Sequence, residues 1–302
     1  MAIPVRYPFP GVSRPGPRAC CSIALIAIVL SGCSINLGSL TPNSEHEEPA
    51  RPTSSINAAS SSTIASLTET IKTNPNDPKA YNMRGSVLAQ AGRTEEALAD
   101  VNKAIGLDPN YAQAYANRGL IYRQTKRLDQ AMADYERALA LDANEAPAYL
   151  GRGLVYKARK QPAEALADFN KAVALAPDNA EAYYNRGLLY QGEGQHQFAV
   201  DDFTAASGLV PQQAEPLLAR AQSYLALDKA KEAAADLDEA VQADPQNAQA
   251  WITRGLAYER LGDRTKAVGS YGRAINLRPK DDAARTGFSR VGGKPGQSYD
   301  TF

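Results

Sequence analysis

The pattern that decides the fold is clearest in residues 183–211, which read YYNRGLLYQGEGQHQFAVDDFTAASGLVP. Its first eight residues begin and end with tyrosine and enclose an Arg-Gly pair. Further on, Ala199, Phe203 and Ala206 follow one another at intervals of four and three residues. Such spacing places small, large and small side chains on a single helical face. The stretch therefore predicts two amphipathic helices joined by a turn.

The same pattern occurs six times between residues 78 and 281, with a constant step of 34 residues. The residue before the glycine position is always arginine, at Arg84, Arg118, Arg152, Arg186, Arg220 and Arg254. The large apolar position of the second helix is Val101, Tyr135, Phe169, Phe203, Leu237 and Tyr271. A fixed period of this length is typical of repeat proteins, in which each unit packs only on its neighbours.

These positions resemble the tetratricopeptide repeat, whose aromatic-x₂-L-G-x₂-Y, A-x₃-F and closing proline positions have counterparts in the chain. The first aromatic position is Tyr81, Tyr115, Tyr149, Tyr183, Leu217 and Trp251. The resemblance implies an all-α fold, an α-solenoid of six 34-residue helix-turn-helix repeats over residues 78–281. It also implies a concave groove lined by the first helix of each repeat.

Both ends of the array need caps, because a terminal repeat lacks a neighbour. Residues 63–77 keep the apolar spacing of a second helix, with Leu67 and Ile71, and are expected to form an N-terminal half repeat. Residues 282–302 are expected to form a capping helix to about residue 290, with Phe288 covering the last repeat, and then a loose tail.

The family usually has leucine before the glycine, whereas this chain has arginine. An acid stands sixteen residues after five of the six arginines, at Asp100, Asp134, Asp168, Asp202 and Asp236, and Ser270 takes its place in the sixth copy. This predicts one ion pair per repeat, between the two helices or between neighbouring repeats. The alternative is an arginine ladder that grips a carboxylate-rich ligand. Arg254, which lacks its acid, is expected to be the most available.

The resemblance implies that ligands lie along the first helices. The two groove columns are Asn82, Ala116, Leu150, Tyr184, Leu218 and Ile252, then Ser86, Leu120, Leu154, Leu188, Gln222 and Leu256. Polar residues accompany them at Asn117, Asn185, Thr253, Arg123, Lys157 and Gln191. The columns are mostly aliphatic, so the family's chaperone-type carboxylate clamp is absent and an apolar or amphipathic segment is the expected ligand.

The residues expected to contact such a partner are Asn117, Leu150, Leu154, Tyr184, Asn185, Leu188 and Ile252. Of these, only Asn117 and Asn185 match the asparagines with which other family members hold a peptide backbone. The alternative for the leucines is that they only pack between neighbouring first helices.

Residues 1–32 have the pattern of a secretory signal, with three arginines as their only charges and an apolar run over 23–30. The run is shorter than the roughly 20 residues that span a membrane. It ends in Leu-Ser-Gly followed by Cys33, which resembles a bacterial lipobox and implies lipidation at Cys33 after cleavage. A plain cleaved signal and an uncleaved anchor are the alternatives. Because Ser34 is not acidic, sorting to the outer membrane, facing the periplasm, is favoured over the inner membrane.

Residues 33–62 are rich in Ser, Thr, Pro, Asn and Ala and predict a flexible tether, since they cannot bury enough apolar surface to fold. The whole chain has 33 basic and 33 acidic residues, but cleavage after Gly32 would remove three arginines and leave a net charge of −3. No basic excess marks a nucleic-acid surface.

No motif in the sequence predicts catalysis, a metal site or a cofactor. The best catalytic candidate is His196 with Asp201 and Asp202, which lacks a nucleophile or third ligand. We therefore expect a non-enzymatic, lipid-anchored scaffold of the bacterial envelope that binds proteins or peptides and no small-molecule substrate. An adaptor is one expected role, and a pilotin-like factor for secretin, pilus or secretion-system assembly is the other.

Overall fold

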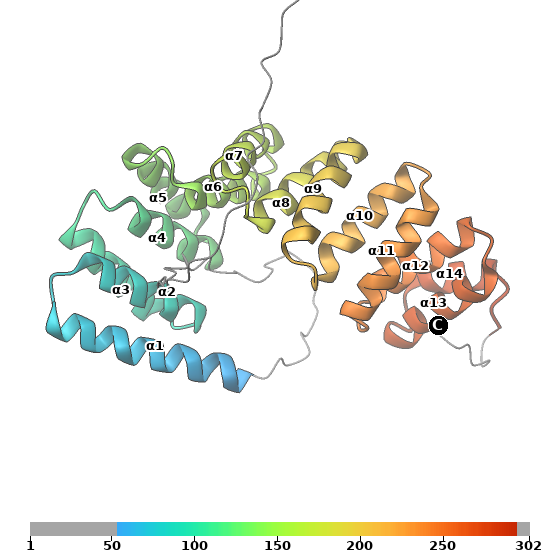
Figure 1. Cartoon of the computed structure of the whole chain (residues 1–302), viewed down its shortest axis with the longest axis horizontal. Coiled ribbons are helices and arrows are strands. Elements are labelled where there is room, and N and C mark those ends of the chain that lie inside the picture. The colour runs from blue at the N-terminus through green and yellow to red at the C-terminus, as the bar shows by residue number, and fades with distance from the viewer. Residues whose placement is uncertain (1–52, 295–302) are drawn as a thin grey trace, which may run out of the picture. The chain divides into compact units, whose positions relative to one another are not determined.

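The computed structural model describes the backbone of residues 53–294 and the side chains of residues 61–294. The expected signal segment 1–32, Cys33 and the tether up to residue 52 lie outside these residues, as does most of the expected C-terminal tail. In the described part every regular element is an α-helix (Figure 1). The all-α prediction is therefore confirmed.

The helices are α1 (Thr53–Thr73), α2 (Pro78–Gln90), α3 (Thr94–Leu107), α4 (Ala112–Gln124), α5 (Leu128–Leu141), α6 (Ala146–Ala158), α7 (Pro162–Leu175), α8 (Ala180–Gly192), α9 (His196–Leu209), α10 (Ala214–Ala226), α11 (Ala230–Ala243), α12 (Ala248–Arg260), α13 (Arg264–Leu277) and α14 (Asp282–Arg290). From α2 to α13 they form the six expected helix-turn-helix pairs. In each pair the turn contains one left-handed residue, at Gly92, Lys126, Lys160, Gly194, Asp228 and Gly262, which reverses the chain after the first helix.

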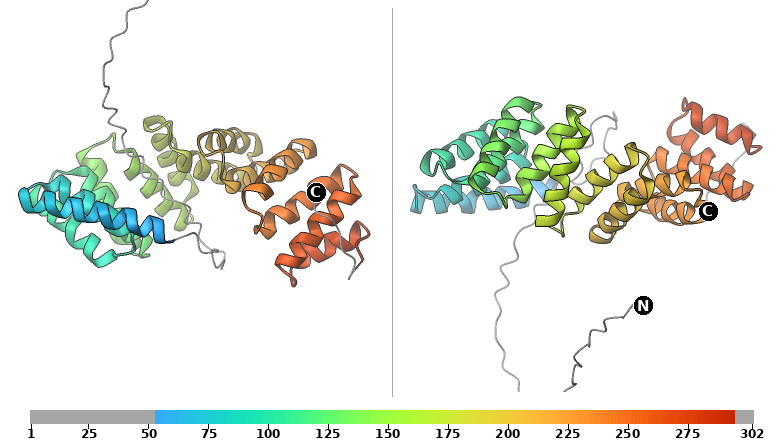
Figure 2. Two further views of the ribbon diagram at one scale, coloured as in Figure 1. Left: turned by 60° about the horizontal axis from the view of Figure 1, so that its bottom comes forward. Right: turned by 90° about the horizontal axis from the view of Figure 1, so that it is seen from above.

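In each pair the two helices pack against each other, and the second helix packs against the first helix of the next pair (Figure 2). The alanine column from Ala97 to Ala267 has no exposed surface, and the large column from Val101 to Tyr271 is at most 1% exposed. Each large side chain contributes about 1.5–3 kcal/mol through burial. The small residues beside it let the helix backbones approach closely enough for that burial.

The N-terminal cap differs from the prediction in its starting point. Helix α1 begins at Thr53, so its first ten residues belong to the segment that was expected to be a flexible tether, and that boundary is wrong. The reason is that no glycine or proline interrupts the chain between residues 53 and 74, and alanine and serine suffice for a helix whose second half is anchored. Ile71 is buried and Ile64 packs against the first core cluster, as a half repeat requires.

The C-terminal cap agrees with the prediction. The Asp281 carboxylate accepts a hydrogen bond from the Ala284 amide and begins helix α14. Phe288 is 8% exposed and belongs to the core cluster of the last repeat, together with Trp251 and Tyr271. The helix thus covers a surface that a seventh repeat would otherwise have to cover.

Candidate functional site

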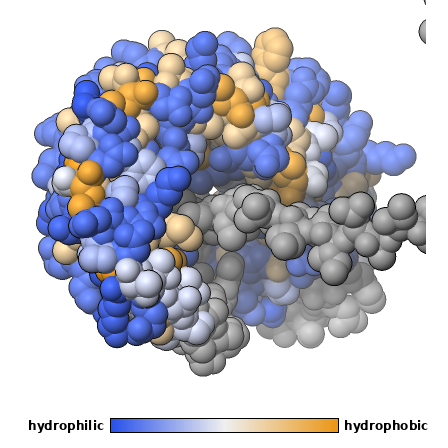
Figure 3. Space-filling view, turned by 60° about the vertical axis from the view of Figure 1, so that its left-hand side comes forward, coloured by the Kyte–Doolittle hydropathy of each residue, from blue (hydrophilic) through white to orange (hydrophobic). Residues whose placement is uncertain are grey.

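The first helices α2, α4, α6, α8, α10 and α12 form the inner face of the array. Most neighbouring first helices, all except α6 and α8, pack against each other as well as against second helices, whereas the second helices have no comparable contact with one another. The helix pairs therefore curve toward their first helices. The space-filling view shows apolar residues scattered among polar ones, with no broad apolar patch on the visible surface (Figure 3).

The apolar residues expected in the groove fall into two groups. Ala116, Leu150 and Ile252 are buried, and Leu150 packs in the core cluster around Phe169. Leu154 and Leu188 are half-buried and lie at the edges of the clusters below them. Leu150 thus contributes mainly to core packing, and Leu154 and Leu188 keep apolar surface available for a partner.

Tyr184 is also half-buried on this face. Its ring centroid lies 5.8 Å from that of Phe203 at a tilted angle, which is a stabilising aromatic arrangement. Burial raises the pKa of its hydroxyl to about 12, so the group stays a neutral donor at physiological pH. The ring supports the core with one side and leaves part of its surface on the inner face.

Most polar side chains expected in the groove form hydrogen bonds between neighbouring first helices. Asn117 donates to the Asn82 side chain at 2.9 Å, and the Lys157 ammonium donates to the Asn185 side chain at 3.0 Å. Gln191 donates to the Ala219 carbonyl and the Ser223 hydroxyl, both at 2.9 Å. These bonds fix the stacking of the repeats, and they engage both asparagines that were expected to hold a peptide.

The arginine column forms the predicted ion pairs, within each repeat. In the first five copies the guanidinium donates two hydrogen bonds to the acid sixteen residues later, at 2.6–2.8 Å: Arg84–Asp100, Arg118–Asp134, Arg152–Asp168, Arg186–Asp202 and Arg220–Asp236. The aspartates are almost fully buried, and the two hydrogen bonds from each guanidinium stabilise their negative charge in the absence of water. The hydrogen bonds to these carboxylates raise the pKa of all five arginines. The prediction of one ion pair per repeat is therefore confirmed, in preference to an arginine ladder that grips a carboxylate-rich ligand.

Several of these arginines also bind the previous repeat. Arg118 donates to Asn102 at 2.7 Å and Arg186 donates to Asn170 at 2.9 Å, in each case sixteen residues back. The guanidinium of Arg186 lies 5.6 and 6.0 Å from the ring centroids of Tyr183 and Tyr190. One arginine thus joins its own first and second helices to the preceding second helix, between two aromatic rings.

The expectation for Arg254 is wrong. Its side chain is 4% exposed; it donates to Asp238 and to the Ser270 hydroxyl, both at 2.7 Å. In this repeat the acid that pairs with the arginine stands sixteen residues before it in the sequence, whereas in the other five repeats it stands sixteen residues after. The charge of Arg254 is compensated from the preceding repeat, by an acid outside the column that the other five repeats share.

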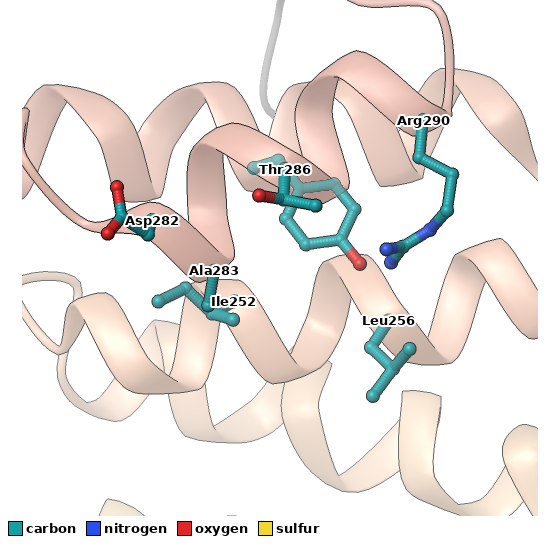
Figure 4. A pocket seen from close by; sticks show the side chains of 7 residues that line it. Ile252, Leu256, Asp282, Ala283, Thr286 and Arg290 are labelled. Atoms are coloured by element: carbon teal, nitrogen blue, oxygen red, sulfur yellow. The ribbon is translucent and has the colours of Figure 1, made fainter.

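At the C-terminal end of the inner face the helices enclose an open pocket of about 370 Å³ (Figure 4). It is lined by Ile252, Leu256, Tyr271, Asp282, Ala283, Thr286 and Arg290. Two expected groove residues thus meet a wall supplied by α14. The Tyr271 hydroxyl donates to Glu259 at 2.9 Å, and Arg290 also binds that carboxylate, so these three side chains beside the pocket are joined by hydrogen bonds.

The structure also shows two close contacts between a tyrosine ring and a glycine, which the sequence did not lead us to expect. The Tyr135 ring lies directly under Gly151, where a Cβ atom would stand 2.2 Å from its Cζ. Tyr271 and Gly287 repeat this arrangement, with a corresponding distance of 2.4 Å. In the sequence, glycine stands sixteen residues after the large column only where that column is tyrosine. This tyrosine–glycine spacing of sixteen residues could have predicted the two contacts from the sequence.

The proposed catalytic group does not assemble. Asp202 is bound by Arg186, and Asp201 accepts a hydrogen bond from Gln197 at 3.1 Å on the exposed side of α9. The His196 Nδ1 atom is buried without a hydrogen-bond partner. Within residues 53–294 there is no group of three His, Cys, Asp or Glu side chains placed to hold a metal ion. None of the helices in that range has the length and apolarity to cross a membrane.

Comparison with protein families identifies the repeats. Residues 85–125, 119–160 and 158–194 match a family described as TPR repeat, and residues 67–99, 180–212 and 218–283 match families described as tetratricopeptide repeat. The chain belongs to the tetratricopeptide repeat family, whose members are generally non-catalytic scaffolds for protein interactions. A comparison with curated protein sequences finds no match.

Several solved structures have the same fold as this chain. The chain is similar to pilF of Pseudomonas aeruginosa, with 23% identity and a TM-score of 0.65, over 71% of this chain and 97% of that one. PilW, a type IV pilus biogenesis factor, has 20% identity and a TM-score of 0.59, over 69% and 97%. Cut9 with Hcn1, from the APC/C, has 16% identity and a TM-score of 0.63 over 78% of this chain, which spans about half of that one (47%). These likenesses show the fold alone.

Proposed function

We propose that this protein is a lipid-anchored scaffold of the bacterial envelope that binds a segment of a partner protein along the inner face of its repeats. The observation that carries the proposal is the contrast between the two sides of each first helix. On one side, the arginines form ion pairs with aspartates inside the array. On the inner face, Leu154, Tyr184 and Leu188 keep exposed surface at successive repeats.

A partner segment suited to this surface is extended or helical, with apolar side chains spaced to meet successive repeats. The half-buried leucines provide apolar contact, and the hydrogen bonds between first helices hold the surface in a fixed shape before binding. Pre-formed surfaces of this kind lose little conformational entropy on association. No catalytic step is required of the protein in this role.

The inner face can be tested with paired leucine substitutions. Leu154→Glu with Leu188→Glu should reduce capture of cross-linked envelope partners at least about tenfold, because a buried apolar contact is replaced by a charge. The matched control is Leu175→Glu with Leu209→Glu, also one repeat apart but exposed on second helices. Equal capture by both double variants would contradict a binding role for the inner face. Partners are identified by cross-linking and mass spectrometry of intact envelopes.

The anchor requires its own test. Changing Cys33 to alanine should abolish palmitate labelling and release the protein from membranes, because stable anchoring needs the acyl chains that this thiol would carry. Labelling that persists in this variant would contradict the lipoprotein assignment. The outcome separates anchoring from partner binding, since the leucine variants leave the cysteine in place.

A pilotin-like role in pilus or secretin assembly is the second candidate. The observation that favours it is the match of this array to almost the full length of pilF and PilW. Deletion of the protein should then reduce secretin multimers or surface pili in the host. Unchanged assembly in the deletion strain would leave the adaptor role as the better proposal.

A further inference from the structure

The open pocket at the C-terminal end of the inner face belongs to the same groove as the other first helices. Ile252 and Leu256, on its α12 side, are members of the two groove columns. Helix α14 begins 34 residues after α12 and packs beside it, so it takes the place of a seventh first helix. By the same step, Thr286 and Arg290 continue the two columns on α14. The pocket is therefore the last segment of the inner-face groove (Figure 4).

This segment is hollow because α14 has small side chains where the three preceding first helices have larger ones. Ala283 stands at the position of Gln249, and Thr286 stands at the position of Ile252. The corresponding pairs on the two helices before are Glu215 with Leu218 and Glu181 with Tyr184. The missing side-chain volume leaves an open space of about 370 Å³ between α12 and α14.

The walls of the pocket are accessible and largely apolar. Ala283 and Thr286 are exposed, and Leu256 is half-buried. Ile252 lies beside Ala283 at one end of the pocket, and Leu256 lies toward the other end (Figure 4). A large apolar side chain that enters this space removes apolar surface of both helices from water, which favours binding.

The two ends of the pocket carry opposite charges, and one of them is compensated within the protein. Arg290, at one end, donates hydrogen bonds to the Glu259 carboxylate. Asp282 lies at the other end (Figure 4) and is exposed, at a position where the six earlier first helices begin with alanine or proline. The capping hydrogen bond of α14 comes from its neighbour Asp281, so the cap does not require the Asp282 carboxylate. A positive charge is therefore the complement of this end of the pocket.

We propose that this pocket binds a large apolar side chain of the partner segment, such as leucine, methionine or phenylalanine, and that a lysine or arginine near it pairs with Asp282. The proposal rests on the proposed function, because the pocket is the end of the same inner face. The apolar side chain lies between α12 and α14, against Leu256 and Ala283. It anchors the segment at the last repeat and so fixes its position along the array.

The chain's own residues 295–302, which read PGQSYDTF, are a less suitable occupant. They follow directly after Lys294 and include two aromatic residues, Tyr299 and Phe302, but their one charged side chain is Asp300. A second acid beside Asp282 is unfavourable, whereas a basic residue is attracted to it. The charge at the pocket therefore favours a separate partner.

The test is a selection of random twelve-residue peptides by mRNA display on the purified full chain. We expect the enriched peptides to share a large apolar position and a basic position near it. Binding of one such peptide is then measured by fluorescence anisotropy. Changing its apolar residue to alanine should weaken binding at least about tenfold, the effect of one buried apolar side chain. Changing its basic residue to glutamine should weaken binding about threefold, as for an exposed ion pair.

A first variant fills the pocket. Ala283→Gln with Thr286→Ile gives α14 the residues that α12 has in the same columns, so their side chains suit a first helix of this array. The variant should bind the enriched peptide at least about tenfold more weakly and the alanine peptide within about twofold of the unaltered chain. The matched control is Ser289→Gln, which enlarges an exposed residue of α14 outside the pocket and should leave binding unchanged. Circular dichroism checks that each variant is folded.

A second variant tests the charge. On Asp282→Asn the basic peptide and its glutamine form should bind equally, because the pairing carboxylate is gone. The control is Asp178→Asn, which removes an exposed acid from the turn before α8 and should keep the threefold preference. A preference that persists on Asp282→Asn would contradict the ion pair.

Enriched peptides that bind the pocket-filling variant normally would overturn the inference. If the same peptides fail to bind the Leu154→Glu, Leu188→Glu protein, the proposed function stands without it. No enrichment on the unaltered chain would also overturn the inference, and envelope cross-linking of the leucine variant would then decide the proposed function separately. Peptides that bind only after Tyr299 and Phe302 are changed to serine would show that residues 295–302 are the occupant and a partner protein is not.

Discussion

Tyr135 and Tyr271 occupy the same position in the second and the sixth repeat, but their surroundings differ. Each ring lies under a glycine of the next first helix, Gly151 or Gly287. The Tyr271 hydroxyl donates to Glu259, but the corresponding residue beside Tyr135 is Arg123, a donor. The end of the array supplies a carboxylate acceptor for the tyrosine hydroxyl, whereas the interior places a guanidinium near it.

The comparison shows that one repeat position can have different structural roles at the end of the array and in its interior. In the last repeat the Tyr271–Glu259 hydrogen bond and the Arg290–Glu259 ion pair attach the capping helix α14. In the second repeat the same tyrosine position gives no such attachment, because the next first helix already packs through its own core contacts.

The largest effect is expected from Gly151→Ala. The added Cβ would lie 2.2 Å from the Tyr135 ring, so the variant should lose about 1–3 kcal/mol of stability through overpacking. Urea unfolding followed by circular dichroism measures the loss. Adding Tyr135→Phe should recover at least half of it, since Phe203 packs with Ala219 at this position in another repeat. A fully stable Gly151→Ala protein would show that the two residues are not coupled.

The two tyrosine hydroxyls should respond in opposite directions. Tyr271→Phe removes a hydrogen bond to a carboxylate and should destabilise the last repeat and α14 by about 1 kcal/mol. Tyr135→Phe removes a buried hydroxyl without a partner and should leave stability equal or slightly higher. Hydrogen exchange of the helices around each site distinguishes the effects. Equal losses in both variants would mean that the two sites do not differ.

The smallest effect is a pH dependence confined to the C-terminal end. The Arg290 guanidinium holds the pKa of Glu259 below its ordinary value of 4.5. The stabilisation is therefore complete above that value and is lost as the pH falls through the lower, folded-state pKa. Lowering the pH from about 7 to about 3 should speed hydrogen exchange of α14 more than that of α6. Glu259→Gln should remove the difference, and an unchanged acid response in this variant would point to another group.

Much of the fold could be predicted because its rules are local and repeated. The 34-residue period, the alanine columns and the arginine-acid spacing each recur often enough to fix the helices and the pairing of their faces. The start of α1 at Thr53 was missed because composition shows that a segment is polar but not that a neighbouring anchored helix extends into it. The compensation of Arg254 by Asp238 was missed because it breaks the column that the other five repeats share.

The sequence by itself determined the repeat, the helical faces and the ion pairs, since all of these follow from spacing along one chain. Only the tertiary structure decided which inner-face residues are buried in the core and which keep exposed surface. Leu150 is buried while Leu154 keeps surface, and Asn117 and Asn185 are engaged by neighbouring repeats. Whether a polar atom is buried depends on how neighbouring helices pack, so the burial of the Arg123 Nε atom and the Tyr135 hydroxyl is visible only in the folded array.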